Sequence, residues 1–233
     1  GIVRETEASG WPAYGGKGKF TSRIDLSNKG LFGNGTLNYL ASTTMSDEFL
    51  FLPDSMNATV YNFENRKATL AGVEYPQVHG DTVYNHWDPY KDLMILSSKA
   101  NSFALYDHQA ELKGDLFLQP SGMSGRGNMK LVSSELDSKH FKYKSEVFDA
   151  DTADFRLASD ESTSLAFSTD NVRAHLDMKQ RFGDFKANGS GTFVKFPLNQ
   201  YISFIDQFKW FMDQKELELS SSSTFAKQEV SDT

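Results

Sequence analysis

The chain has 233 residues, no cysteine and a formal net charge of −7. This length suffices for one large all-β domain or two smaller ones. The missing cysteines exclude disulfides, thiolate metal sites and a cysteine nucleophile. Lys and Arg form no cluster, which argues against nucleic acid as a partner. No apolar run approaches the ~20 residues that a membrane-spanning helix needs.

Alternation of apolar and polar residues with period two dominates the chain, which predicts strands with one buried and one solvated face. Gly, Pro and Asn-rich turn signals separate the alternating segments. The clearest segments, in chain order, are Phe20–Leu26, Leu37–Tyr39, Phe49–Phe51, Phe141–Tyr143, Phe185–Ala187 and Leu217–Leu219.

Residues 199–213 fit two predictions. Tyr201, Ile205, Phe208 and Met212 have the spacing of an amphipathic helix. By analogy with earlier parts of the chain, Gln207–Trp210 is instead a strand, and we favour that interpretation. The segment from Ser220 onward is polar and Ser-rich, which is typical of a fraying end or a linker.

A glycine pattern occurs twice, at an offset of 92 residues. The two copies are Gly30, Gly33, Gly35 and Gly122, Gly125, Gly127. Apolar positions follow the same offset, and Val83–Asp88 resembles Val172–Asp177 at an offset of 89. This predicts a repeated unit of about 90 residues. We expect a first unit at 1–100, a second at 101–190, a partial third at 191–219, and a polar tail or linker at 220–233.

One polar cluster could hold a metal ion. His79 and Asp81 share a face of a predicted strand, as do His86 and Asp88. Imidazole and carboxylate groups are ligands for divalent metals. The alternative is that all four are solvent-facing polar residues, which we favour because no further ligand is implied. We predict no metal and no cofactor.

Carboxylates gather at Asp149, Asp151 and Asp154. A glycosidase needs two carboxyl groups about 5–10 Å apart across a cleft, and Asp149 and Asp151 fit that spacing on one strand face. Asn57 and Thr59 occupy the matching positions in the first copy. We therefore favour a turn or strand-edge role and assign no catalytic residue.

Five aromatic residues are candidates for stacking on sugar rings if they are exposed: Trp11, Tyr75, Trp87, Tyr90 and Trp210. Trp87, Tyr90 and Trp210 are the ones we carry forward as candidate ligand-binding residues. The alternative is ordinary core and edge packing, which we favour for these aromatic residues.

The glycine hairpins, the Phe-x-Phe strands that follow them and the segment Trp87–Asp92 resemble a repeat-containing cell-envelope protein of Bacteroidota. The layout is similar to the stacked-strand proteins of the AsmA/TamB and LptA/OstA-like groups. That resemblance implies an exported, periplasmic or cell-surface protein whose strands stack into a trough with a hydrophobic inner face.

The predicted fold class is all-β, an elongated repeat-built stack of mostly antiparallel strands, like a β-solenoid or β-taco. We expect a non-enzymatic structural or binding module of a bacterial envelope, and one version of it carries lipid in an apolar trough. Its expected partners are other envelope proteins or further repeats, with lipid or glycan as ligands. A carbohydrate-binding or adhesion module is the first alternative, and a polysaccharide-active β-solenoid enzyme using Asp149 and Asp151 is the second.

Overall fold

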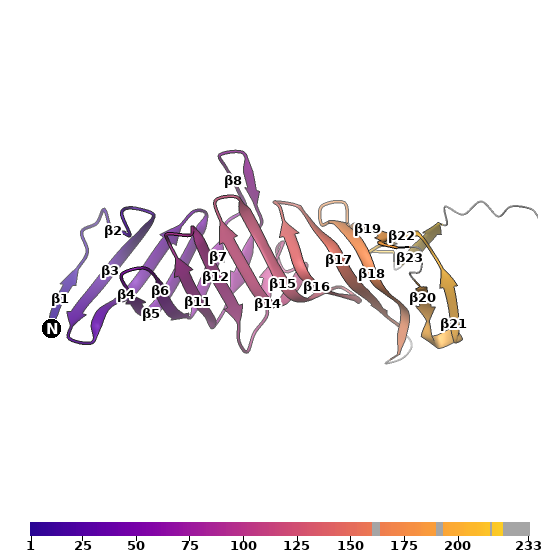
Figure 1. The fold of residues 1–233 in the computed structure, drawn as a ribbon, viewed down its shortest axis with the longest axis horizontal. Coiled ribbons are helices and arrows are strands. Elements are labelled where there is room, and N and C mark those ends of the chain that lie inside the picture. The colour runs from indigo at the N-terminus through magenta and orange to yellow at the C-terminus, as the bar shows by residue number, and fades with distance from the viewer. Residues whose placement is uncertain (160–163, 190–192, 215, 221–233) are drawn as a thin grey trace, which may run out of the picture.

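The structure is a computed structural model that describes residues 1–159, 164–189, 193–214 and 216–220. These residues form an elongated body whose strands cross its long axis, with the N-terminus at one end (Figure 1). They contain one antiparallel sheet of 21 strands and a separate two-stranded hairpin. The predicted all-β, mostly antiparallel fold class is confirmed at this level. Among the described residues, no helix has the length and apolar character of a membrane span.

Eight long strands run across the body. They are β3 (Gly18–Ser27), β4 (Gly30–Tyr39), β5 (Ser42–Phe51), β14 (Ala110–Gln119), β15 (Gly122–Leu131), β16 (Ser134–Tyr143), β17 (Val147–Ala158) and β18 (Leu165–Asp177). Tight turns join β3 to β4 to β5 and β14 through to β17, and β18 pairs with β17, so strands that follow each other in sequence are also neighbours in the sheet.

Shorter strands lie end to end in pairs, and each pair occupies one position in the sheet. For example, β6 pairs with Phe49–Phe51 of β5, and β7 pairs with Ser42–Met45 of the same strand. The pairs are β1 (Ile2–Glu5) with β2 (Trp11–Ala13), β6 (Met56–Val60) with β7 (Asn62–Asn65), β11 (Val83–Asp88) with β10 (Val78–Gly80), β12 (Leu93–Ser98) with β13 (Phe103–Leu105), β19 (Phe182–Ala187) with β20 (Phe193–Phe196), and β22 (Gln207–Phe211) with β21 (Tyr201–Phe204). The sheet ends at β23 (Glu216–Ser220), and β8 (Ala68–Leu70) with β9 (Val73–Tyr75) forms the hairpin.

Long strands bend near their middle, and the short pairs break at the same place. The ladder register shifts between Gly33 and Gly35 and again between Gly125 and Gly127. Gly35 has a φ of 155° and Gly127 a φ of 131°, a conformation that side chains with a Cβ rarely adopt. Bulges of this kind bend a strand and increase its twist. The row of bends therefore folds the sheet lengthwise into two walls.

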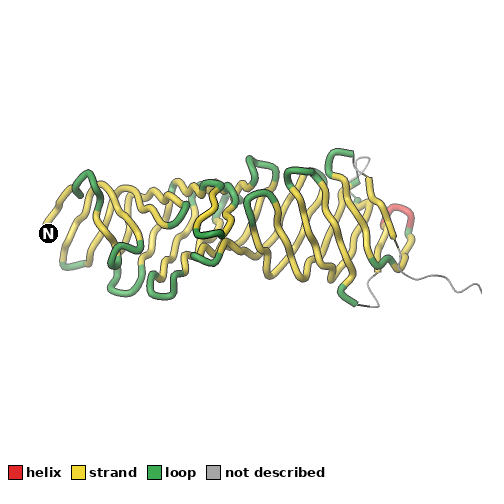
Figure 2. Tube along the Cα trace, turned by 90° about the horizontal axis from the view of Figure 1, so that it is seen from above, coloured by secondary structure: helices red, strands yellow, loops and turns green. Residues whose placement is uncertain are grey.

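We call the walls the first wall and the second wall. The first wall holds β2, β7, β10, β13, β20 and β21, and the second wall holds β1, β6, β11, β12, β19, β22 and β23. Each long strand contributes one half to each wall, and in Figure 2 the strands of the two walls cross over one another.

The core lies between the walls and is rich in aromatic side chains. Phe20 of the first wall packs edge-on against Phe49 of the second, with ring centroids 5.4 Å apart. Tyr39 and Trp87 meet across the walls at 5.0 Å, and Phe155 lies 5.6 Å from Trp210. Alternation with period two places these rings on the inward faces. The predicted one-sided strands thus build a single continuous core.

Tyrosines close the body on the side opposite the bends, along a line that we call the seam. The Tyr14 hydroxyl donates to the carbonyl oxygens of Leu52 and Ser55, and the Tyr106 hydroxyl donates to that of Val147. Tyr75 likewise donates to Gln119 and Pro120, over 2.8 and 2.9 Å. Ion pairs reinforce the seam at Lys17–Asp92 and Lys67–Glu146. The ends of the two walls are therefore tied together by side chains rather than by a strand ladder.

Because of the seam, the free energy of unfolding should depend on pH in the alkaline range. Burial raises the pKa of Tyr14 from 10.0 to about 12, so the folded chain keeps a proton that the unfolded chain loses near its ordinary value. The free energy of unfolding should therefore fall as pH rises from about 10 to about 12. Denaturant titrations across this range should show a shallower fall for Tyr14→Phe than for the wild type. Tyr90→Phe, at a residue that is 67% exposed, is the control. Equal slopes for the wild type and Tyr14→Phe would contradict the prediction.

The ambiguous segment at residues 199–213 is extended. A single 3-10 turn, Pro197–Asn199, precedes β21, and β22 contains the predicted strand Gln207–Trp210. The strand prediction is confirmed and the helix alternative is wrong, because Phe208 and Trp210 both face the core and so follow a period of two. Ser220 ends β23, and the rest of the predicted tail, 221–233, lies outside the described residues. The division into units at 1–100, 101–190 and 191–219 stays a prediction.

Candidate functional site

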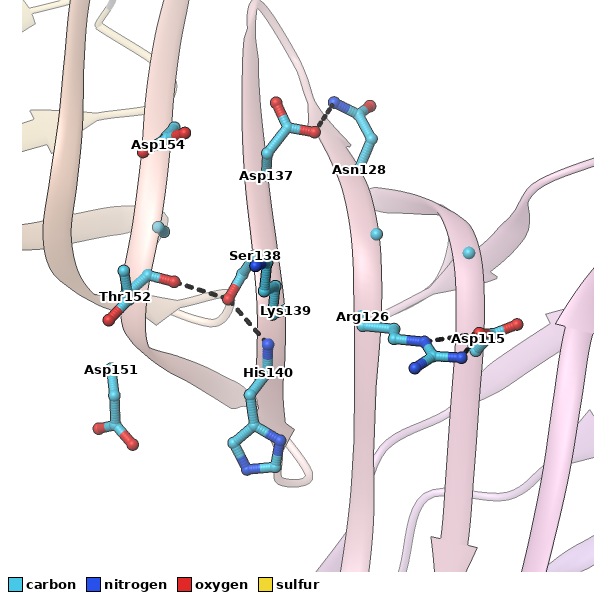
Figure 3. A pocket seen from close by; sticks show the side chains of 13 residues that line it. Asp115, Arg126, Asn128, Asp137, Ser138, Lys139, His140, Asp151, Thr152 and Asp154 are labelled. Atoms are coloured by element: carbon cyan, nitrogen blue, oxygen red, sulfur yellow. Dashed lines mark hydrogen bonds and ion pairs between the residues drawn. The ribbon is translucent and has the colours of Figure 1, made fainter.

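A groove crosses the bends of four neighbouring strands, β14 to β17 (Figure 3). Its volume is about 800 Å³, within the range of roughly 300–1,000 Å³ that is typical of ligand pockets. It lies on the outside of the body and does not open into the core. The bend itself creates the groove, because the sheet changes direction there and side chains on either side diverge.

Backbone forms the floor of the groove. Gly114 and Gly127 are opposite each other in the ladder between β14 and β15. A Cβ on Gly114 would overlap the carbonyl oxygen of Arg126, and one on Gly127 would overlap that of Lys113. Both glycines also have positive φ. No other residue type fits these positions without strain, so the floor stays free of side chains.

The rim carries charged groups, and most of them are already paired. Arg126 contacts Asp115 at 2.7 Å, and the Asn128 amide donates to Asp137 over 3.0 Å. Asp137 also pairs with Arg156 of the next strand. Figure 3 shows the Arg126–Asp115 pair on one side of the glycine floor and the Asn128–Asp137 pair on the other. The rim therefore presents donors and acceptors without a large excess of either charge.

Lys139 and His140 differ from the rest of the rim. Both are exposed at the bend of β16, and neither has an ion-pair partner among the residues that the structure describes. His140 is close enough to Asp151 to help lower the pKa of that carboxyl, although Lys142 has the larger effect. Both side chains can therefore donate hydrogen bonds to a ligand in the groove.

A serine holds the bend in shape. The Ser138 hydroxyl donates to the carbonyl oxygen of Thr152 over 2.7 Å. It also accepts from the backbone N–H of His140 over 3.1 Å. Ser46, 92 residues earlier, makes the same pair of bonds with Thr59 and Glu48 at 2.7 and 3.0 Å. The bend is thus built alike at β5 and β16.

Only the side chains around the two bends differ. Asp47 and Glu48 stand at the positions that Lys139 and His140 occupy 92 residues later, so the local charge is reversed. At the earlier bend the two acidic residues line smaller hollows, of about 540 and 430 Å³. The two bends therefore share the serine hydrogen bonds but offer opposite charges to a ligand.

The three candidate acids of β17 have separate partners. Asp149 pairs with His175 at 2.6 Å, Asp151 with Lys142 at 2.9 Å, and Asp154 accepts from the Asn171 N–H over 3.0 Å. A bulge between Ala150 and Ala153 sets them apart along the strand. Asp151 and Asp154 line the groove, whereas Asp149 does not. The lowered pKa of Asp151 keeps it ionised, which is the opposite of what a general acid needs.

The four metal candidates do not come together. His79 lies on β10 in the first wall, between Glu64 at 2.5 Å and Asp81 at 3.2 Å. Burial by itself lowers the pKa of His79, but the hydrogen bonds and charges of these two carboxylates outweigh it and raise the pKa.

The other two metal candidates lie on β11 in the second wall. His86 contacts Asn57 at 2.7 Å, and Asp88 accepts from the backbone N–H groups of Tyr90 and Lys91. The described residues contain no group of three or more His, Asp or Glu side chains that could hold a metal ion.

Two of the three aromatic candidates are in the core. Trp87 and Trp210 are both 0% exposed, which agrees with the core packing that we favour for them. Their positions on β11 and β22 fall in phase with the inward-facing residues of the second wall. Trp87 packs on Tyr14 and Tyr39 and therefore offers no ring face to a ligand in solution. Tyr90 is 67% exposed and remains a candidate.

Trp11 and Tyr75 also belong to the packed structure. Trp11 is half-buried against Phe51, with ring centroids 5.1 Å apart, and Tyr75 is 0% exposed with its hydroxyl in the seam. Sequence reasoning missed both the seam and the groove. The recurrence of Tyr14 at Tyr106 and of Ser46 at Ser138 was the available signal, because polar residues at the offset of the glycines point to a structural bond.

No protein-family model, curated protein or solved structure matches this chain.

Proposed function

We propose that this chain is a non-enzymatic structural module of a bacterial cell envelope. We infer further that it is built from repeated units of about 90 residues stacked along one axis, in the manner of a β-solenoid or β-taco. Matched features 92 residues apart support the repeat: the glycine register shifts, the seam tyrosines Tyr14 and Tyr106, and the bend serines Ser46 and Ser138. The envelope location is supported by the resemblance of the glycine hairpins and Phe-x-Phe strands to Bacteroidota proteins.

The filled interior is the observation that carries the structural role. The side chains of the core cluster between the walls are almost all under 6% exposed, and the largest are fully buried aromatic rings. Protein interiors packed in this way leave few voids larger than a water molecule. An acyl chain would have to displace core rings and open the seam. We therefore favour the scaffold version of the function over the lipid-carrying one.

The shape suits a spacer. Fourteen strand-to-strand steps link β1 to β23 along the second wall, and at about 4.8 Å each they make a sheet roughly 70 Å long. The core between the walls and the seam at their ends both resist bending. Such a body would hold its partners, which we take to be further repeats or other envelope proteins, at a fixed separation.

Native mass spectrometry of the chain, purified from a Gram-negative periplasm without detergent, distinguishes the two versions. We expect a mass equal to that of the polypeptide, because the interior has no room for an acyl chain. Addition of a phospholipid with a fluorescent acyl chain should give no saturable binding. Co-purified phospholipid or lipopolysaccharide in a fixed ratio to protein would overturn the scaffold proposal.

A further inference from the structure

We propose that the groove over the bends of β14 to β17 binds a neutral oligosaccharide. This role goes beyond that of a spacer and does not depend on it. It also differs in place from any site built on Trp87 or Trp210, which lie in the core.

The shape of the groove fits a chain-like ligand. It crosses four adjacent strands, and three steps of about 4.8 Å make it roughly 14 Å long. The bare backbone of Gly114 and Gly127 allows a ligand to approach the floor closely. The rim on either side is polar, and the floor at Gly114 and Gly127 carries no side chain. A short, flat, hydroxylated chain matches this form.

The chemistry of the rim matches hydroxyl groups better than ions. Asp115, Asp137 and Asp151 already have Arg126, Arg156 and Lys142 as counter-ions. Each carboxylate can still accept from a ligand, since it has about four lone-pair sites.

Lys139 and His140 supply donors. A sugar hydroxyl both donates and accepts, so it can use both kinds of group. A cation would instead meet carboxylates that already have counter-ions, which lowers its gain from binding.

The bend of β5 at Ser46 provides an internal control for the bend of β16 at Ser138. The serine bond that shapes the groove recurs there, with Thr59 in the place of Thr152. Both threonines are exposed, so a large side chain at either one would occupy space over the bend without entering the core. Asp47 and Glu48 replace the two donors. Paired substitutions at matched positions can therefore separate binding in the groove from effects on the fold.

Isothermal titration of the full chain with cellohexaose, maltohexaose and the N-acetylglucosamine hexamer tests the proposal, with polygalacturonate as the charged comparator. We expect saturable binding of at least one neutral probe. Thr152→Trp should abolish that binding, and Lys139→Ala with His140→Ala should weaken it about tenfold or more. Thr59→Trp and the pair Asp47→Ala with Glu48→Ala should leave it unchanged. Thermal melts of each variant identify any loss of fold.

Three results would overturn the proposal. The first is the absence of saturable binding by any neutral probe at millimolar concentration. The second is binding that Thr152→Trp leaves intact, or that Thr152→Trp and Thr59→Trp reduce equally in folded protein. The third is binding of polygalacturonate alone, which would indicate attraction between charges rather than recognition of hydroxyl groups.

Discussion

Replacing Trp87 by alanine should lower the free energy of unfolding by about 3–5 kcal/mol, the range seen when a large buried aromatic ring is truncated. The indole is 0% exposed and contacts Tyr14 and Tyr39 from the opposite wall, with centroids 5.3 and 5.0 Å away. It also lies so close to Gly18 that a methyl group there would overlap it. Its removal leaves a cavity that the stiff sheet around it cannot close.

Chemical denaturation of Trp87→Ala, followed by far-UV circular dichroism, measures this loss. Tyr90→Ala is the matched control, because Tyr90 belongs to the same segment but is 67% exposed. Its effect should stay within about 0.5 kcal/mol. Similar losses at the two positions would show that Trp87 is not the core residue that the structure describes. The comparison also bears on ligand binding, since a loss of binding in Trp87→Ala would first have to be separated from unfolding.

Replacing Gly127 by alanine should lower the free energy of unfolding by about 3 kcal/mol or more, from backbone strain and overpacking together. Its φ of 131° lies in a region that L residues rarely occupy. The new Cβ would also overlap the Lys113 carbonyl oxygen and crowd Gly114. The ladder between β14 and β15 would have to part at the bend to relieve these contacts.

Gly72→Ala separates the two causes. Gly72 also has a positive φ, 80°, but nothing lies within 4 Å of the position that a Cβ would take. Its replacement should therefore cost only the backbone term, about 1 kcal/mol. Denaturant midpoints of the two variants give the difference directly. If Gly127→Ala lowered the free energy of unfolding no more than Gly72→Ala, the result would contradict the close packing at the bend.

Much of the fold follows from local patterns in the sequence. Alternation with period two specifies which residues of each strand face inward, as Phe49 and Phe51 do in β5. The glycine blocks mark both the turn at Gly30 and the bend at Gly35. The strand at Gln207–Trp210 was predictable by comparison with earlier strands, against a helical spacing that was only coincidental.

The candidate sites were much less predictable. Alternation shows which residues share a face but does not show where the sheet bends. His79 and His86 are seven residues apart in sequence yet lie in different walls, because the chain crosses the bend between β10 and β11. Residues that are near in sequence can thus be separated by a fold in the sheet.

The sequence by itself determined that this protein is a set of one-sided antiparallel strands with glycines at fixed intervals, since both properties depend only on neighbouring residues. Only the tertiary structure decided that the sheet folds back on itself, that tyrosines close the seam and that a groove crosses the bends at β14 to β17. Tyr106 and Val147 meet across 41 positions of sequence, and Gly114 faces Gly127 only through the ladder register. Contacts of this range depend on the summed twist and bending of many strands, which no local pattern specifies.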